Sequence, residues 1–192
     1  MIHSTPGHDP YPQWSRRIAD SDAAALEELF HAMHDALARY AERLVRDPAA
    51  AGDLVQEAFI RIWARRARLD ASLSLRALLY RTVRNLAFNH VRDERTRERL
   101  LSERYEPEGW RDPGPAARVE GRELRDQLER WIGELPARQR EALMLSRVEG
   151  LSHDEIAAVL EVAPRTINNH LVRALRTLRD RLDARSPLGG VA

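Results

Sequence analysis

The sequence contains no cysteine and no lysine, so all 31 of its basic residues are arginine, and it has no long apolar run. The absence of cysteine excludes disulfide bonds and thiolate metal ligands. No segment approaches the roughly 20 apolar residues that a membrane-spanning helix needs, and the polar N-terminal segment lacks the apolar core of a signal peptide. These features predict a cytoplasmic protein without membrane insertion.

Glycine and aromatic residues are also scarce, whereas alanine, leucine and arginine are abundant. This composition favours helices, and a chain of 192 residues can bury one or two small cores. Apolar residues recur at three- and four-residue intervals, and no segment shows the alternation that is typical of a strand. The sequence therefore predicts an all-α fold.

The most informative segment is residues 152–171, SHDEIAAVLEVAPRTINNHL. Ser152 is followed three residues later by Glu155, which is the spacing of a capping box, so a helix is expected to begin there. Pro164 suits the first turn of a second helix, where its missing N–H costs nothing. The small Ala157 lets the two helices cross closely at a steep angle. The segment therefore predicts a helix-turn-helix.

The second helix of this motif is expected to have two distinct faces. Its apolar residues predict a buried stripe: Ile167, Leu171, Leu175, Leu178 and Leu182. The opposite face carries side chains that can read guanine and adenine edges or hold phosphates. These candidate DNA contacts are Arg165, Thr166, Asn168, Asn169, Arg173 and Arg176. An ordinary helical hairpin with a solvated polar face is the alternative interpretation.

The positive charge is concentrated in two segments, although the formal net charge of the chain is only +1. Residues 76–99 contain seven arginines and three carboxylates, and residues 164–181 contain five arginines and one carboxylate, so each segment nets +4. A generic nucleic-acid coat protein is disfavoured by the low net charge, whereas two local basic surfaces are compatible with specific DNA binding.

The distribution of helix breakers divides the chain into parts. Residues 1–20 lack periodicity and are expected to form a flexible N-terminal tail. Two small helical domains are expected over residues 21–101 and 119–184, with the helix-turn-helix in the second. Residues 102–118 contain several prolines and glycines and predict a flexible linker. Residues 185–192 are expected to form a C-terminal tail.

Four segments, in order, resemble the signature segments of the extracytoplasmic-function sigma factors. They are residues 54–63 (LVQEAFIRIW), 79–87 (LYRTVRNLA), 135–140 (LPARQR) and 155–157 (EIA). The resemblance covers about residues 22–184. It implies domains like sigma regions 2 and 4, and core RNA polymerase, promoter DNA and an anti-sigma factor as partners. It also implies a subunit that is not itself an enzyme and that needs no cofactor.

The resemblance also implies roles for particular residues. Contacts with a coiled coil of the largest polymerase subunit are implied for Asp53, Gln56, Glu57, Arg61 and Trp63. Binding of the unstacked strand of the minus 10 element is implied for Arg76, Tyr80, Arg84, Asn85, Asn89 and Arg92. The helix-turn-helix set would bind the minus 35 element. Trp63 and Tyr80 can equally be packing residues, and packing is the expectation for Phe88.

Three positions depart from the usual family pattern. Leu78 stands where the family usually has Trp, Asn89 where it has Asp, and Ala163 where it has a capping Ser. Because alanine cannot cap a helix with its side chain, the first turn of the second helix is expected to depend on Pro164 and Thr166.

Two other classes of protein are compatible with parts of the sequence. A conventional helix-turn-helix regulator that binds DNA without polymerase would leave the first helical domain unexplained and would usually dimerise. An enzyme or metal site is suggested only by His31 and His34, three residues apart, with Asp35 directly after them. No HExxH motif and no further clustered ligand accompanies them. Because the sequence also has no glycine-rich phosphate loop and no nucleophile elbow, we expect no catalytic site and no metal.

Overall fold

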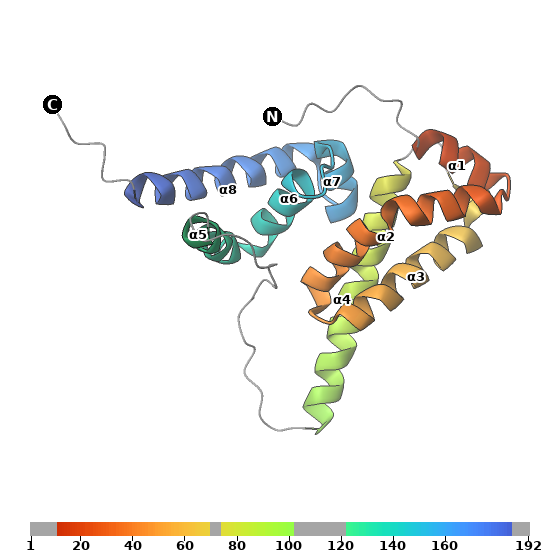
Figure 1. Ribbon diagram of the computed structural model, residues 1–192, viewed down its shortest axis with the longest axis horizontal. Helices are drawn as coiled ribbons and strands as arrows, with labels where there is room; N and C mark the ends of the chain where they lie inside the picture. The colour runs from red at the N-terminus through yellow and green to blue at the C-terminus, as the bar shows by residue number, and fades with distance from the viewer. Residues whose placement is uncertain (1–10, 70–73, 102–121, 186–192) are drawn as a thin grey trace. The chain divides into compact units, whose positions relative to one another are not determined.

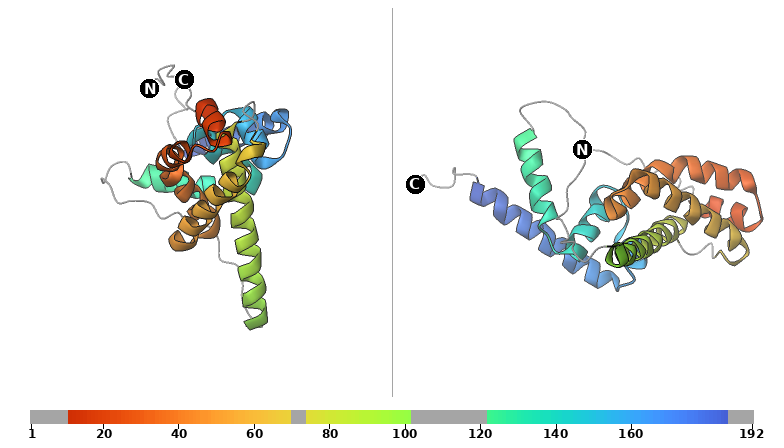
Figure 2. Two further views of the ribbon diagram at one scale, coloured as in Figure 1. Left: turned by 90° about the vertical axis from the view of Figure 1, so that its right-hand side faces the viewer. Right: turned by 90° about the horizontal axis from the view of Figure 1, so that it is seen from below.

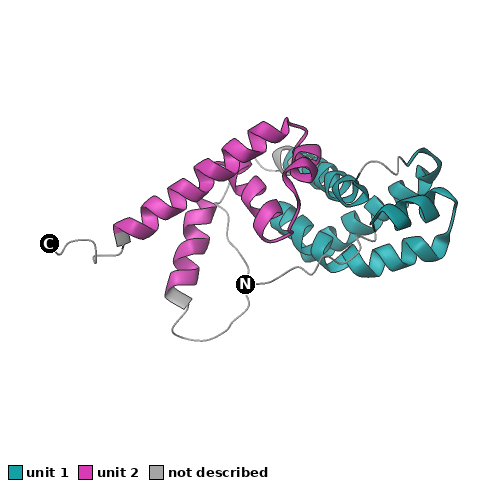
Figure 3. Ribbon diagram, turned by 90° about the horizontal axis from the view of Figure 1, so that it is seen from above, with its two compact units in different colours: residues 1–104 teal, residues 105–192 magenta. Residues whose placement is uncertain are grey.

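The computed structural model describes residues 11–69, 74–101 and 122–185, and within these ranges every regular element is helical. The chain divides into two units, residues 1–104 and 105–192 (Figure 3). The division falls in the expected linker, residues 102–118, which itself lies outside the described residues, as do residues 1–10 and 186–192 of the expected tails. The predicted all-α fold is confirmed.

The described part of the first unit contains α1 (Tyr11–Ala19), α2 (Ala23–Val45), α3 (Pro48–Ala64), the 3₁₀ turn η1 (Arg66–Arg68) and α4 (Leu75–Leu101) (Figure 1). Helices α2, α3 and α4 pack against one another. Their inward faces supply buried side chains that include Leu29, Leu37, Val55, Phe59, Leu79, Tyr80 and Val83. Removal of this apolar surface from water is the main force that holds the three helices together.

Aspartate side chains start the two helices α2 and α3. Asp22 and Asp47 each accept hydrogen bonds from the amides two and three positions further on, at 2.9–3.3 Å. These amides have no acceptor within their helix, so the carboxylates stabilise the first turns. Pro48 occupies the first turn of α3, where its missing N–H costs nothing. Arg46 ends α2 in the left-handed conformation, with φ 61°, and turns the chain into α3.

The described part of the second unit contains α5 (Arg122–Gly133), α6 (Ala137–Arg147), α7 (His153–Leu160) and α8 (Pro164–Arg185). Helix α8 contacts each of the other three. The core is built from side chains of α6, α7 and the first half of α8: Ala142, Leu143, Leu145, Ile156, Val159, Leu160, Ile167, Leu171 and Ala174.

The predicted apolar stripe of α8 is buried only in its first half. Ile167 and Leu171 are buried, but Leu175 and Leu182 are 41% and 47% exposed. Helix α8 has 22 residues, whereas α6 and α7 have 11 and 8, so these partners are too short to cover it. The prediction of one continuous buried stripe is therefore wrong, because helical spacing does not report how long the neighbouring helices are.

The expected flexible tail over residues 1–20 is also wrong for residues 11–19, which form α1. This helix contacts α2, α4 and η1, and its Ile18 is fully buried. Several of its other contacts with α2 are polar. Tyr11 Oη, for example, donates to Met33 Sδ of α2 at 2.9 Å. A nine-residue helix held in this way offers too short an apolar pattern to be recognised from sequence.

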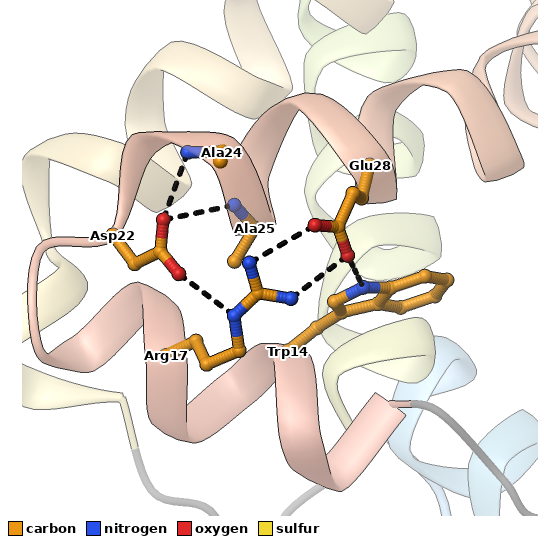
Figure 4. Close-up of polar contacts among 6 residues, drawn as sticks. All are labelled: Trp14, Arg17, Asp22, Ala24, Ala25 and Glu28. Atoms are coloured by element: carbon orange, nitrogen blue, oxygen red, sulfur yellow. Dashed lines mark hydrogen bonds and ion pairs between the residues drawn. The ribbon is translucent and has the colours of Figure 1, made fainter.

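Arg17 joins α1 to the start of α2 (Figure 4). Its two terminal nitrogens donate to the carboxylate of Glu28 at 2.8 and 2.9 Å, and its Nε donates to Asp22 at 2.7 Å. Trp14 Nε1 donates to the same Glu28 carboxylate at 2.9 Å. These hydrogen bonds raise the pKa of Arg17 and hold the pKa values of Asp22 and Glu28 below their ordinary range.

Replacement of Arg17 by glutamine should lower the unfolding temperature at neutral pH and have less effect in acid. The lowered carboxylate pKa values mean that the stabilisation is present above the ordinary values, 3.8 for Asp22 and 4.5 for Glu28. It is lost as the pH falls through the still lower folded-state values. The difference in Tm between wild type and Arg17→Gln, followed by circular dichroism, should therefore narrow below about pH 4.

Arg16→Gln is the matched control, because Arg16 is an exposed arginine of the same helix whose side chain takes no part in this network. Arg16→Gln should leave Tm nearly unchanged both at neutral pH and in acid. A Tm difference for Arg17→Gln that stayed constant down to about pH 3 would contradict the role assigned to the two carboxylates.

Candidate nucleic-acid and protein interfaces

Helices α7 and α8 form the predicted helix-turn-helix. The Ser152 amide donates to Glu155 Oε2 at 2.8 Å and the Glu155 amide donates to Ser152 Oγ at 3.2 Å, which confirms the capping box. Glu161 ends α7 in the left-handed conformation, with φ 57°. Helix α8 then begins at Pro164, as predicted. Local chemistry thus fixes both ends of the turn.

Buried side chains fix how α8 is rotated about its own axis. Ile156 of α7 and Ile167 of α8 have no exposed surface, and Ala157 is nearly as buried. The contact between α7 and α8 therefore holds one face of α8 inward. Residues on the other side of the helix must point outward.

The candidate minus 35 residues lie on this outward part of α8. Five of the six are exposed and Thr166 is partly buried; the exposed ones are Arg165, Asn168, Asn169, Arg173 and Arg176. The Thr166 amide donates to the Ala163 carbonyl at 2.8 Å, which closes the first turn where no capping side chain is available. The structure therefore presents arginine and amide donors together on one helix, as base-edge and phosphate recognition requires.

The candidate minus 10 residues are divided between the surface and the interior of α4. Asn85, Asn89 and Arg92 are exposed. Arg76 is partly buried, and its guanidinium lies 5.9 Å from the centre of the Tyr11 ring of α1. The C-terminal part of α4 runs beyond the other helices of its unit (Figures 1 and 2).

Tyr80 is a core residue, which corrects its assignment as a DNA contact. It has no exposed surface, and its ring packs edge-on against Tyr40 with 5.2 Å between the ring centres. The sequence left both roles open, because a tyrosine has an apolar ring that suits a core and a hydroxyl that suits a surface.

Arg84 and Phe88 also differ from expectation. Arg84 is only 6% exposed, and its guanidinium lies 4.4 Å from the centre of the Phe88 ring. Phe88 was expected to pack in the core but is 44% exposed, so that expectation is wrong. The core-facing positions of α4 are already occupied by residues such as Val83 and Leu86, which leaves Phe88 outside.

The candidate polymerase contacts of α3 form an exposed polar face. Asp53, Gln56 and Arg61 are exposed, and Glu57 is partly buried. Arg61 Nε pairs with Glu57 Oε1 at 2.7 Å. These residues project away from the side of α3 that packs on α2 and α4.

Ile60 is a residue of this face that the sequence interpretation missed. It is 62% exposed and lies at helical spacing from Asp53 and Glu57, at the centre of the polar face. A signal was available, because Ile60 does not belong to the i, i+3, i+4, i+7 set that begins at Val55 and forms the buried side of the helix.

Trp63 borders this face at its C-terminal end, because it lies at helical spacing from Ile60 and Gln56, and it contacts η1. It is partly buried, and the guanidinium of Arg66 lies 4.5 Å from the centre of its ring. Arg66 also donates to the Trp63 carbonyl at 3.0 Å and to Ser21 Oγ at 2.9 Å. Both interpretations of Trp63, packing and interface, are therefore compatible with its position.

The histidines of α2 make local contacts. His31 Nε2 lies 3.8 Å from Glu27 Oε1, and His34 Nδ1 lies 3.1 Å from Asp35 Oδ1. Within residues 11–69, 74–101 and 122–185, no group of three His, Asp or Glu side chains is placed to hold a metal ion. In the same ranges no helix is both long and apolar enough to span a membrane.

Comparison with known families matches both units. The model for sigma-70 region 2 matches residues 29–97, and the model for sigma-70 region 4 matches residues 125–178. The RNA polymerase sigma-E factor of Streptomyces coelicolor is 34% identical over 162 residues, which is 83% of this chain and 86% of that protein.

Two further sigma factors are also similar to this chain. The ECF RNA polymerase sigma factor SigE of Mycolicibacterium smegmatis is 33% identical over 168 residues; the match covers 85% of this chain and 65% of SigE. A solved structure of the sigma factor RpoE from Bartonella quintana, in complex with the anti-sigma factor NepR, is similar with a TM-score of 0.63 and 26% identity. That similarity covers 83% of this chain and 98% of RpoE. The chain therefore belongs to the extracytoplasmic-function sigma factors.

Proposed function

We propose that the chain is an initiation subunit that binds core RNA polymerase, directs it to specific promoters and assists strand opening. The observation that carries this proposal is that the segments matching sigma regions 2 and 4 lie in separate units, each with an exposed face rich in arginine and asparagine. Synthesis of RNA would belong to the polymerase, and the chain would act in the cytoplasm without enzymatic activity of its own.

In this proposal the outward face of α8 binds the minus 35 element in the major groove. Arginine pairs with guanine and asparagine with adenine through two hydrogen bonds each, and other arginines hold phosphates. Thr166 belongs to this set, because its hydroxyl can donate to a phosphate or a base edge. The other members are the exposed residues Arg165, Asn168, Asn169, Arg173 and Arg176.

The exposed residues of α4 would bind the minus 10 element. Asn85, Asn89 and Arg92 form the proposed surface, with Arg76 at the N-terminal end of the helix. An opened strand needs cationic groups along its backbone and polar groups near its bases, and this surface supplies both. Tyr80 is left out because it is buried.

The outward face of α3 would dock on the core enzyme. An interface of moderate affinity combines charged groups, which steer association, with a central apolar anchor. Asp53, Gln56, Glu57 and Arg61 supply the polar groups, and Ile60 supplies the anchor. We further propose that an anti-sigma protein covers these surfaces, by analogy with the complex of RpoE and NepR.

The first test is run-off transcription with purified core RNA polymerase on a library of bacterial promoters, with and without the chain. We expect transcripts with defined start sites only when the chain is present, because promoter choice requires both DNA-binding surfaces. A chain that binds duplex DNA but neither assembles with core enzyme nor confers start-site choice would instead favour a conventional helix-turn-helix regulator.

Replacement of Arg173 by alanine should weaken binding to the selected promoter and leave assembly with core enzyme unchanged. Loss of a base or phosphate contact should reduce affinity by about 5- to 150-fold, measured by fluorescence anisotropy with a labelled minus 35 duplex. Arg125→Ala is the control, because Arg125 is an exposed arginine of the same unit that pairs with Glu129 on α5. Equal loss of DNA and core-enzyme binding would contradict this division of roles.

Substitutions on the outward face of α3 should weaken assembly with core enzyme and leave DNA binding unchanged. Asp53→Arg and Ile60→Ala should each weaken assembly with core enzyme by about 5- to 30-fold, while binding of the isolated chain to the minus 35 duplex persists. Assembly can be measured by titration of labelled chain with core enzyme. Asp35→Arg, which makes the same charge change on an exposed site of α2, should assemble normally. Normal assembly of both α3 variants would remove this face from the proposal.

A further inference from the structure

Val172 is an apolar side chain on the polar outward face of α8. It is 55% exposed, whereas Leu171 beside it and Ala174 two positions further on are buried. An outward valine adds nothing to the core, and valine is a poorer helix former than alanine, so neither packing nor helix propensity explains this residue. The surroundings of Val172 are therefore informative about what it contacts.

The neighbours of Val172 on the helix surface are amide and cationic side chains. Residues three and four positions apart adjoin one another on an α-helix, so Asn168 and Asn169 lie on one side of Val172 and Arg176 lies on the other. All three neighbours are exposed. Val172 thus stands at the centre of the face that would enter the major groove, where a side chain meets base edges rather than phosphates.

The direction of the valine side chain is fixed before any ligand binds. A β-branched valine within a helix has one strongly preferred χ1 rotamer. The buried side chains of Ile167 and Leu171 hold the rotation of α8 about its own axis. The two methyl groups of Val172 are therefore preorganised, and a contact with them costs little conformational entropy.

We propose that Val172 contacts the 5-methyl group of one thymine in the minus 35 element and makes the chain select thymine at that position. The methyl group of thymine is the apolar group that base pairs present in the major groove, and the other base edges there are hydrogen-bond donors and acceptors. Val172 is the apolar counterpart among side chains that pair with those polar edges. This inference rests on the proposed function and adds a specificity-determining residue to its minus 35 surface.

Charge favours duplex DNA over an apolar protein partner as the ligand of Val172. A protein that used Val172 as a hydrophobic anchor would have to desolvate Arg173 and Arg176 or supply a carboxylate to each of them. Duplex DNA supplies phosphates to the arginines, donors and acceptors to the asparagine amides, and a methyl group to the valine. One ligand class therefore satisfies all three kinds of side chain.

The test uses the holoenzyme assembled from full-length chain and core RNA polymerase. The probes are copies of a promoter duplex, chosen by the run-off selection, in which each thymine of the minus 35 segment on either strand is replaced in turn by deoxyuridine. Deoxyuridine keeps every hydrogen-bonding group of thymine and lacks only the methyl group. Wild-type holoenzyme should lose about 4-fold in affinity at one of these positions, measured by competition binding, because a buried methyl group contributes roughly that factor.

A substitution then assigns the methyl contact to Val172. Val172→Ala should weaken binding to the thymine duplex by about 4- to 15-fold and should abolish the effect of deoxyuridine at the sensitive position, so that the two losses are not additive. Alanine favours a helix more than valine does, so this variant should unfold at no lower a temperature than wild type. Val148→Ala makes the same change at another exposed valine and should keep both the wild-type affinity and the deoxyuridine effect.

Each contrary outcome has a distinct meaning. A selected minus 35 segment without a deoxyuridine-sensitive thymine, or an equal deoxyuridine effect in wild type and Val172→Ala, would overturn the methyl contact while leaving the sigma function intact. Reduced assembly of Val172→Ala with core enzyme would overturn it in favour of a protein contact. Failure of the wild-type chain to assemble with core enzyme would overturn the proposed function and this inference together.

Discussion

The contact between Tyr40 of α2 and Tyr80 of α4 is the constraint on which the first unit's surface depends. Both rings are buried, and they lie edge to face with 5.2 Å between centres. Because side chains of an α-helix are related by a fixed rotation, an inward Tyr80 determines the direction of every other residue of α4. Asn85, Phe88 and Arg92 point outward because Tyr80 points inward. Tyr80, which the sequence allowed either as a DNA contact or as a packing residue, therefore sets from within which residues of α4 face outward.

The second unit also fixes which residues of a helix face outward, but it uses helix capping as well as packing. Helix α7 has only eight residues, so its position depends on chemistry at its two ends as well as on packing. Ser152 and Glu155 satisfy amides at its start, and Glu161 turns the chain in the left-handed conformation at its end. Buried Ile156 and Ile167 then set the rotation of α8. In both units, an outward polar face is only as well defined as the inward apolar face behind it.

Features that depend on a few neighbouring residues could be predicted from the sequence. The helix starts at Ser152 and Pro164, the all-α fold and the helix-turn-helix all follow from local capping and periodicity. Features that depend on the length or placement of another helix could not. The burial of Tyr80, the exposure of Phe88 and the exposure of Leu175 each require knowledge of which partner covers that part of the helix, and a single helix pattern does not contain it.

Only the first half of α8 is covered by other helices, and this affects the local dynamics of the helix. Its first half is fastened by buried side chains such as Ile167 and Ala174. Its far half contacts α5, and Arg181 pairs at 2.6 Å with Glu134 in the turn between α5 and α6. We therefore expect backbone amides in the first half to exchange with solvent deuterium only when the unit opens, and those beyond Leu175 to exchange through local fraying. The far end of α8 can thus adjust to a new neighbour while the turns packed against α6 and α7 stay rigid.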